Sequence, residues 1–138
     1  MSKFIIDCSA VMSLFLHDER NTDYGNIIFK QLEHSDCIVP SLWNYELSNI
    51  LLSCKKRKRL DNLQINKISD LIYKLPITID SQNFYFIFKN VFNIATDNNL
   101  SIYDASYIEL AKRFNCSLAT LNKKLIEVAK NLNINLIL

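Results

Sequence analysis

The sequence has very little glycine, and this scarcity excludes several kinds of nucleotide-binding site. It contains 1 glycine and 2 histidines among 138 residues. Glycine-rich loops bind phosphates because glycine adopts positive φ angles and lets the backbone approach closely, so Rossmann and P-loop nucleotide binding are excluded. The histidines, His17 and His34, are too few and too far apart for a Ser-His-Asp triad or an HExxH zinc motif. We therefore expect any catalysis to depend on carboxylates.

Paired cysteine motifs are also lacking. The 4 cysteines are Cys8, Cys37, Cys54 and Cys116, and no two of them are spaced as CxxC. This spacing argues against a zinc site. Free thiols that pack as small hydrophobic residues fit a reducing compartment better than a disulfide framework does.

No hydrophobic run is long enough to cross a membrane, because a span needs roughly 20 apolar residues. The segment Met1–Ile6 resembles the start of a signal peptide, but Asp7 interrupts it and no cleavage site of small residues follows. We expect a soluble, cytoplasmic protein that has no membrane partner.

Neither sign of charge dominates. The 16 Lys and Arg residues against 14 Asp and Glu residues give a formal net charge of +2, which is too small to indicate nucleic-acid binding by overall charge. A local basic stripe remains compatible with this value. The length and the 49% hydrophobic content fit one globular domain over residues 1–138 that buries its own core.

Short apolar runs alternate with amphipathic stretches along the whole chain. The apolar runs predict strands at residues 4–6, 37–39, 77–79, 118–121 and 134–138. Helical spacing of apolar residues predicts helices at residues 10–16, 42–58, 63–72, 84–95, 102–114 and 123–132, and a further one that starts at Asn21 or Thr22 and runs towards His34. The expected N-caps are Ser9, Ser41, Asp61 or Asn62, Ser81 and Ser101. The alternation predicts an α/β fold with a parallel sheet covered by helices.

Acidic residues are expected at the edge where the strands of this sheet end, which is where ligands bind in open parallel α/β sheets. Asp7 follows the first predicted strand. It either caps the next helix or binds a ligand, and Ser9 offers an alternative cap. Glu46 lies beside Trp43 and Ile50 at the edge of an apolar helical stripe. It is either a salt-bridged surface residue or, because an unpaired buried charge is costly, a ligand of a cation.

Asp104 occupies the first turn of its predicted helix and shares a face with Tyr107. The helix dipole explains an exposed acid at this position but does not explain one that faces inward. Together, Asp7, Glu46 and Asp104 predict an oxygen-only site of the kind that suits Mg²⁺ or Mn²⁺.

Four segments carry a resemblance to a known family. They are Ile5–Ser9 (IIDCS), Pro40–Leu47 (PSLWNYEL), Tyr103–Ala111 (YDASYIELA) and Leu118–Leu125 (LATLNKKL). In this order they resemble the motifs of PIN-domain ribonucleases, in particular the VapC-type toxins of bacterial toxin–antitoxin pairs. The resemblance implies a PIN-like three-layer fold with a five-stranded parallel sheet flanked by helices. It also implies a metal-dependent endoribonuclease that leaves 5′-phosphate and 3′-hydroxyl ends, a homodimer, and an inhibitory antitoxin partner.

The resemblance also implies roles for single residues. Asp7, Glu46 and Asp104 match the metal-binding acids of the family, and Ser9 matches the hydroxyl residue beside the first acid. Asn122 departs from the pattern because the family usually has a fourth acid there, and an amide offers only a neutral carbonyl oxygen. Whether one or two Mg²⁺ or Mn²⁺ ions bind therefore stays open.

A run of cations, Lys55, Lys56, Arg57, Lys58 and Arg59, closes the helix that carries Glu46. These residues either complement the helix dipole in solvent or contact the phosphates of RNA, and Lys123 beside Asn122 is a further candidate for RNA contact. The aromatic residues between Phe84 and Phe92 are more typical of a core or a dimer interface than of a base-stacking platform.

Two other functions compete with the nuclease. A catalytically degenerate PIN fold could act as an RNA- or protein-binding module, for which Asn122 is the only indication. A receiver-type Mg²⁺-binding signalling domain has a similar length, but Asp7 has no adjacent acid, and Asp80 would have to be the phosphorylated residue.

Overall fold

The computed structural model describes residues 2–16, 19–81, 85 and 87–138. Its centre is a parallel sheet with the strand order β3-β2-β1-β4-β5. The strands are β1 (Ser2–Ile6), β2 (Ser35–Val39), β3 (Ile77–Ile79), β4 (Ser117–Ala119) and β5 (Leu136–Ile137). The expectation of a five-stranded parallel sheet in an α/β fold is confirmed.

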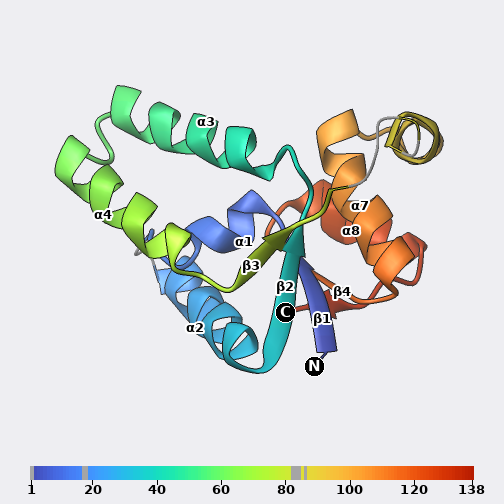
Figure 1. Ribbon diagram of the computed structural model, residues 1–138, viewed down its shortest axis with the longest axis horizontal. Helices are drawn as coiled ribbons and strands as arrows, with labels where there is room; N and C mark the ends of the chain where they lie inside the picture. The colour runs from blue at the N-terminus through green and yellow to red at the C-terminus, as the bar shows by residue number, and fades with distance from the viewer. Residues whose placement is uncertain (1, 17–18, 82–84, 86) are drawn as a thin grey trace.

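Helices cover both faces of the sheet (Figure 1). They are α1 (Cys8–Met12), α2 (Glu19–His34), α3 (Trp43–Lys56), α4 (Asn62–Tyr73), the π-helix η1 (Ile87–Val91), α6 (Phe92–Asn98), α7 (Ile102–Phe114) and α8 (Lys123–Asn131). Figure 1 shows α1 and α2 on one side of the sheet and α7 and α8 on the other, which makes three layers. Helices α3 and α4 form a hairpin that extends outward from the first layer.

The central strand β1 is buried on both faces, because it lies between β2 and β4 and under both helical layers. Phe4, Ile5 and Ile6 have no exposed surface, which explains why this strand appears in the sequence as a continuous apolar run. Asp7 follows directly, and its backbone N–H continues the ladder by donating to the carbonyl of Ala119 at 3.1 Å. The strand thus delivers Asp7 to the carboxyl edge of the sheet.

Two of the N-caps expected from the sequence are wrong. Asp7, not Ser9, caps α1, and its carboxylate accepts a hydrogen bond from the Ala10 N–H at 3.0 Å. The N-cap of α3 is Leu42, which makes no side-chain cap hydrogen bond, so Ser41 does not cap this helix. Asp61 and Ser101 are confirmed as the N-caps of α4 and α7.

Several boundaries also differ from the prediction. Helix α1 ends at Met12, β4 ends at Ala119, and β5 is limited to Leu136–Ile137. Within the described residues, the predicted aromatic helix at 84–95 is the π-helix η1 followed by α6, which continues to Asn98. Its expected start at Ser81–Phe84 includes residues 82–84, which lie outside the described residues.

Four of the helices are followed by a non-glycine residue in the left-handed conformation, where glycine is otherwise common. Asn99, Asn115 and Asn133 follow α6, α7 and α8 with φ between 49° and 59°, and Lys58 follows α3 with φ of 58°. Asparagine tolerates this region better than most residues do, whereas lysine does not.

None of the helices in the described part of the chain has the length and apolar character that a membrane crossing requires.

Candidate metal and active site

The three predicted acids surround one small cavity at the carboxyl end of β1. The cavity has a volume of about 150 Å³, and its lining residues are Asp7, Cys8, Ser9, Glu46, Ile50, Asp104, Tyr107 and Asn122. Asp7 comes from the end of β1, Glu46 from the first turn of α3, and Asp104 from the first turn of α7. The fold therefore brings together residues that are up to 97 positions apart in the sequence.

Asp7 is the most firmly held of the three carboxylates and is only 5% exposed. Its Oδ1 accepts hydrogen bonds from the Ser9 hydroxyl at 2.6 Å and the Ala10 N–H at 3.0 Å. Its Oδ2 accepts a hydrogen bond from the Thr120 hydroxyl. A carboxylate has about four acceptor positions, so roughly one remains for a further partner such as a cation.

The same two hydroxyls connect β1 to the segment after β4. Ser9 Oγ accepts from the Leu121 N–H at 2.9 Å, and Thr120 Oγ1 accepts from the Asn122 N–H at 3.0 Å. Ser9 thus positions Asp7 rather than capping α1, and Thr120 does the same from the opposite side. The sequence did not single out Thr120, because only the tertiary fold brings it to Asp7.

Glu46 is held by Tyr107, a residue whose role the sequence did not indicate. The Tyr107 hydroxyl donates to Glu46 Oε1 at 2.5 Å, and Cys8 Sγ lies 3.5 Å from the same oxygen. Tyr107 is 1% exposed, so its hydroxyl has little access to water as an alternative partner. The one feature of the sequence that could have indicated this role is the position of Tyr107 three residues after Asp104, which places both on one helical face.

Asp104 is half-buried at the start of α7. Its backbone N–H donates to the Ser101 hydroxyl at 3.1 Å, which is the N-cap bond of the helix. No described residue forms an ion pair with Asp104. Its carboxylate is therefore available at the cavity.

The electrostatics of the cavity disfavour negative charge. Burial raises the pKa of Asp7, although the hydrogen bonds from Ser9, Thr120 and Ala10 oppose this shift, and the charge of Glu46 adds to it. Burial and Glu46 likewise raise the pKa of Asp104 against the hydrogen bond with Ser101. A divalent cation would relieve this repulsion, and carboxylate oxygens are suitable ligands for Mg²⁺ or Mn²⁺.

The three carboxylates do not have the close spacing that ligands of one bound ion have. Among the described residues, no three His, Cys, Asp or Glu side chains are grouped tightly enough to ligate one metal. Asp7 is fixed, whereas Glu46 and Asp104 are partly exposed and can change rotamer. The set of donors fits a hard divalent cation, and ligation would require Glu46 and Asp104 to turn towards Asp7.

Asn122 lines the cavity, but its side-chain carbonyl oxygen accepts hydrogen bonds from the backbone of α8. It is the N-cap of α8, and Oδ1 accepts hydrogen bonds from the N–H groups of Lys124 and Leu125 at 3.0 and 3.3 Å. The neutral oxygen that the sequence analysis considered as a ligand is thus committed to the helix.

The cationic residues do not line this cavity. Lys55, Lys56, Arg57, Lys58 and Arg59 are all exposed at the far end of α3. Lys123 is exposed in the first turn of α8 and is the nearest of the predicted cations in sequence to a cavity residue.

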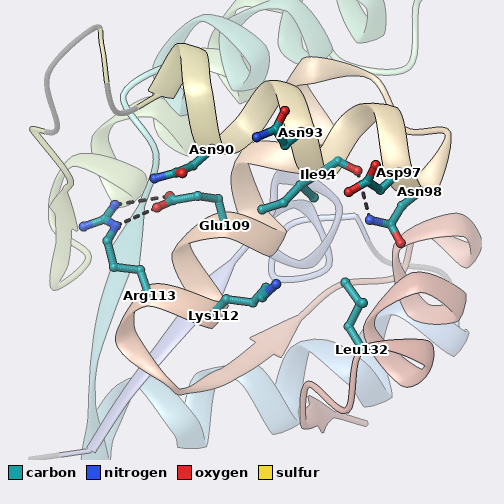
Figure 2. Close-up of a pocket in the computed structure, with 9 residues that line it drawn as sticks. All are labelled: Asn90, Asn93, Ile94, Asp97, Asn98, Glu109, Lys112, Arg113 and Leu132. Carbon is teal, nitrogen blue, oxygen red and sulfur yellow. Dashed lines mark hydrogen bonds and ion pairs between the residues drawn. The ribbon is translucent and has the colours of Figure 1, made fainter.

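A larger cavity of about 570 Å³ lies on another part of the molecule (Figure 2). Its lining comes mainly from η1, α6 and α7, and Figure 2 shows Glu109 and Arg113 paired at one end of it. Arg113 Nε lies 2.7 Å from Glu109 Oε1, and Nη2 lies 2.6 Å from Asp80 Oδ2. These charges compensate one another, which gives them a structural role.

Asp80 therefore does not resemble a phosphorylated aspartate, since it is paired with Arg113. The strand order β3-β2-β1-β4-β5 also differs from the 2-1-3-4-5 order of receiver-like folds. The structure thus contradicts the receiver interpretation.

The fold and the site together define a class: an α/β protein with an acidic cavity at the carboxyl edge of a parallel sheet. The family model of the PIN domain matches residues 4–131, so the chain belongs to the PIN domain family. A relative, Ribonuclease VapC3 of Pyrobaculum aerophilum, is 23% identical over 125 residues, which cover 91% of this chain and 93% of the relative.

Solved structures show the same fold. PAE2754 from Pyrobaculum aerophilum has a TM-score of 0.66 and 21% identity, with 99% of this chain and 84% of that chain covered. VapBC2 from Rickettsia felis, bound to a DNA fragment from its promoter, has a TM-score of 0.64 and 18% identity over 97% and 96% of the two chains. FitAcB from Neisseria gonorrhoeae has a TM-score of 0.63 and 13% identity over 98% and 96%.

Proposed function

We propose that this chain is a metal-dependent endoribonuclease and the toxin component of a toxin–antitoxin pair. The observation that carries the proposal is the convergence of Asp7, Glu46 and Asp104 on one cavity at the carboxyl edge of the sheet. Membership of the PIN domain family and the similarity to Ribonuclease VapC3 support an RNA substrate.

Asp7, Glu46 and Asp104 would hold Mg²⁺ or Mn²⁺. When bound, such an ion lowers the pKa of a water and stabilises charge on the scissile phosphate. Ser9 and Thr120 keep Asp7 in one orientation, and the Tyr107 hydroxyl restrains Glu46. Hydrolysis by an activated water would leave a 5′-phosphate and a 3′-hydroxyl.

The number of ions depends on the charge of the cavity. Three carboxylates provide a charge of −3, which suits one divalent ion, and Asn122 adds a neutral group that is engaged in the α8 cap. We propose one firmly bound ion, with a second bound only when the RNA phosphate supplies further oxygen ligands.

The proposed partners are RNA, an antitoxin protein that blocks the cavity, and a second copy of the chain in a homodimer. The similarity to VapBC2 and FitAcB supports the antitoxin. The proposed location is the cytoplasm, where RNA and an antitoxin made alongside the toxin are both present.

The competing function is a PIN fold that binds RNA or protein without cleaving it, and the specific observation in its favour is an amide at position 122. Incubation of purified protein with total RNA and Mn²⁺, followed by analysis of the new ends, separates the two functions. The nuclease proposal expects 5′-phosphate ends that disappear with EDTA and in Asp104→Asn. Intact RNA in every reaction would favour the binding module.

A further inference from the structure

Five cations, Lys55, Lys56, Arg57, Lys58 and Arg59, occupy the end of α3 and the turn that leads to α4, and we call them the basic tip. Figure 1 shows this turn at the outer end of the α3–α4 hairpin, away from the sheet. Without the basic tip the chain would carry 11 basic and 14 acidic residues, a net charge of −3. The net positive charge of the chain thus depends on one small region.

Asp61 is the one acidic residue that lines a surface cavity together with Lys55 and Lys58, and it is not ion-paired with either of them in the described structure. All five side chains of the basic tip are exposed, and none of them makes an ion pair or side-chain hydrogen bond with another described residue. The helix dipole accounts for cations in the last turn of α3 but not for Lys58 and Arg59 beyond it.

The backbone conformation of Lys58 is a second indication that the basic tip serves binding. Lys58 has φ of 58°, and the other three non-glycine residues with positive φ in the described ranges are all asparagine. A lysine in this conformation is disfavoured relative to Asn or Gly, so the turn carries a charge at the expense of local stability. Such a local conflict is typical of positions that serve binding.

The face of α3 that carries Glu46 extends along the helix from the acidic cavity to the basic tip. Glu46 and Ile50 line the cavity, and positions 46, 50, 53 and 57 share one face of a helix because they are spaced i, i+4, i+7 and i+11. Arg57 therefore lies at the end of the Glu46 face, roughly 16 Å along the helix axis. Tyr45, which is 83% exposed, flanks the start of this path.

We propose that the basic tip binds the phosphate backbone of the RNA strand whose bond is cleaved in the acidic cavity, several nucleotides away. This inference rests on the proposed nuclease function for the identity of the polymer. Three carboxylates repel an RNA strand, and one divalent ion offsets only part of their charge, so attraction has to come from cations elsewhere. Arginine side chains at the tip suit phosphate because their planar donors match its oxygens.

The test compares two triple variants that remove the same charge. The tip variant is Lys56→Gln/Arg57→Gln/Arg59→Gln, and the control is Lys67→Gln/Lys74→Gln/Lys130→Gln, whose three lysines are also exposed. Binding of a long labelled oligouridine is measured without metal by fluorescence anisotropy over a range of salt concentrations. A trinucleotide serves as the short probe, because it cannot occupy the acidic cavity and the whole basic tip at the same time.

We expect the tip variant to bind the long strand about tenfold or more weakly and to lower the salt slope by about 2, since each single-strand phosphate contact contributes about 0.7. Its preference for the long strand over the trinucleotide should shrink. The control variant should keep most of the affinity for the long strand and most of the preference for it over the trinucleotide. Equal losses in the two variants would show a dependence on overall charge and would overturn the proposal.

A single substitution guards against misfolding. Lys58→Asn removes one charge and places a residue that favours positive φ, so it should raise the melting temperature while weakening RNA binding. Unchanged RNA binding together with a raised melting temperature would contradict a role for Lys58.

Two further outcomes separate this inference from the nuclease proposal. If native protein leaves RNA intact with Mn²⁺ while binding still depends on the tip, the nuclease proposal fails and the RNA-binding tip stands. If the tip variant cleaves and binds RNA as well as the native protein does, the inference is wrong. It is also wrong if the variant binds RNA normally and is weakened only in its binding of a glutamate-rich peptide, used as an acidic protein probe.

Discussion

The hydrogen bond between Tyr107 and Glu46 offers a quantitative test of how the cavity is organised. Tyr107→Phe removes only the hydroxyl that donates to Glu46 Oε1 at 2.5 Å. A hydrogen bond to a charged group contributes about 1.5–3 kcal/mol, and the lower end applies because Glu46 is half-buried and can turn to water. For a domain of this size, about 1.5 kcal/mol corresponds to a melting temperature lower by about 5 °C.

Tyr103→Phe is the matched control, because Tyr103 lies on the same helix but is 60% exposed. It should change the melting temperature by less than about 1 °C. Both variants are followed by thermal unfolding without metal and by calorimetric titration with Mn²⁺. We expect Tyr107→Phe to weaken Mn²⁺ binding about tenfold, because residues that orient a ligand typically contribute this much. If the two variants behaved alike in both assays, Tyr107 would not be a positioning residue for Glu46.

Three further substitutions test other parts of the structure. The stabilisation of the metal-free protein by Asp7→Asn should grow as the pH rises from the ordinary Asp pKa through the raised pKa of Asp7, because in this window the native state retains a proton that the unfolded chain has released and the native protein loses stability. Urea unfolding at several pH values measures this, and a pH-independent difference would contradict it. Asn122→Ala should cost about 1 kcal/mol through loss of the α8 cap. Asn122→Asp keeps a capping oxygen but adds a negative charge to the acidic cavity, so it should be less stable without metal and need less Mn²⁺ for half-maximal cleavage; an Asn122→Ala protein as stable as the native one would refute the cap assignment. Arg113→Met should cost about 3 kcal/mol in chemical unfolding because it leaves Asp80 and Glu109 without their partner, and a loss below about 1 kcal/mol would show that the pairing is unimportant.

The order of strands and helices could be predicted because the signal is periodic and local. Fully buried parallel strands such as β1 appear as continuous apolar runs, and the amphipathic stretches between them indicate the helices. The caps of α4 and α7 could be predicted, but the cap of α1 could not, since Asp7 and Ser9 are both good N-cap residues two positions apart. Only the position of the Ala119 carbonyl, which fixes the Asp7 backbone, decides between them.

The π-helix η1 could not be predicted from the spacing of apolar residues. Residues 87–91 follow an i to i+5 hydrogen-bond pattern, and an aromatic-rich sequence carries no distinct signature of it. A helix over 84–95 was therefore the expected interpretation, and the structure replaces it with two elements that continue to Asn98.

The candidate site was predictable to the extent that chain position determines it. Asp7 and Asp104 sit at element ends that the sequence marks, and Glu46 lies at the edge of an apolar stripe. Thr120 and Tyr107 were not predictable as positioning residues, because their partners are 113 and 61 residues away and only the tertiary fold pairs them.

The central claim is that Asp7, Glu46 and Asp104 bind one divalent ion, and diffraction from a crystal soaked in Mn²⁺ tests it most directly. We predict one anomalous peak in the cavity at the end of β1, within about 2.0–2.3 Å of an oxygen from each of the three carboxylates. A peak elsewhere, such as beside Asp97 in the larger cavity, or no peak among the three carboxylates at saturating Mn²⁺, would contradict the claim.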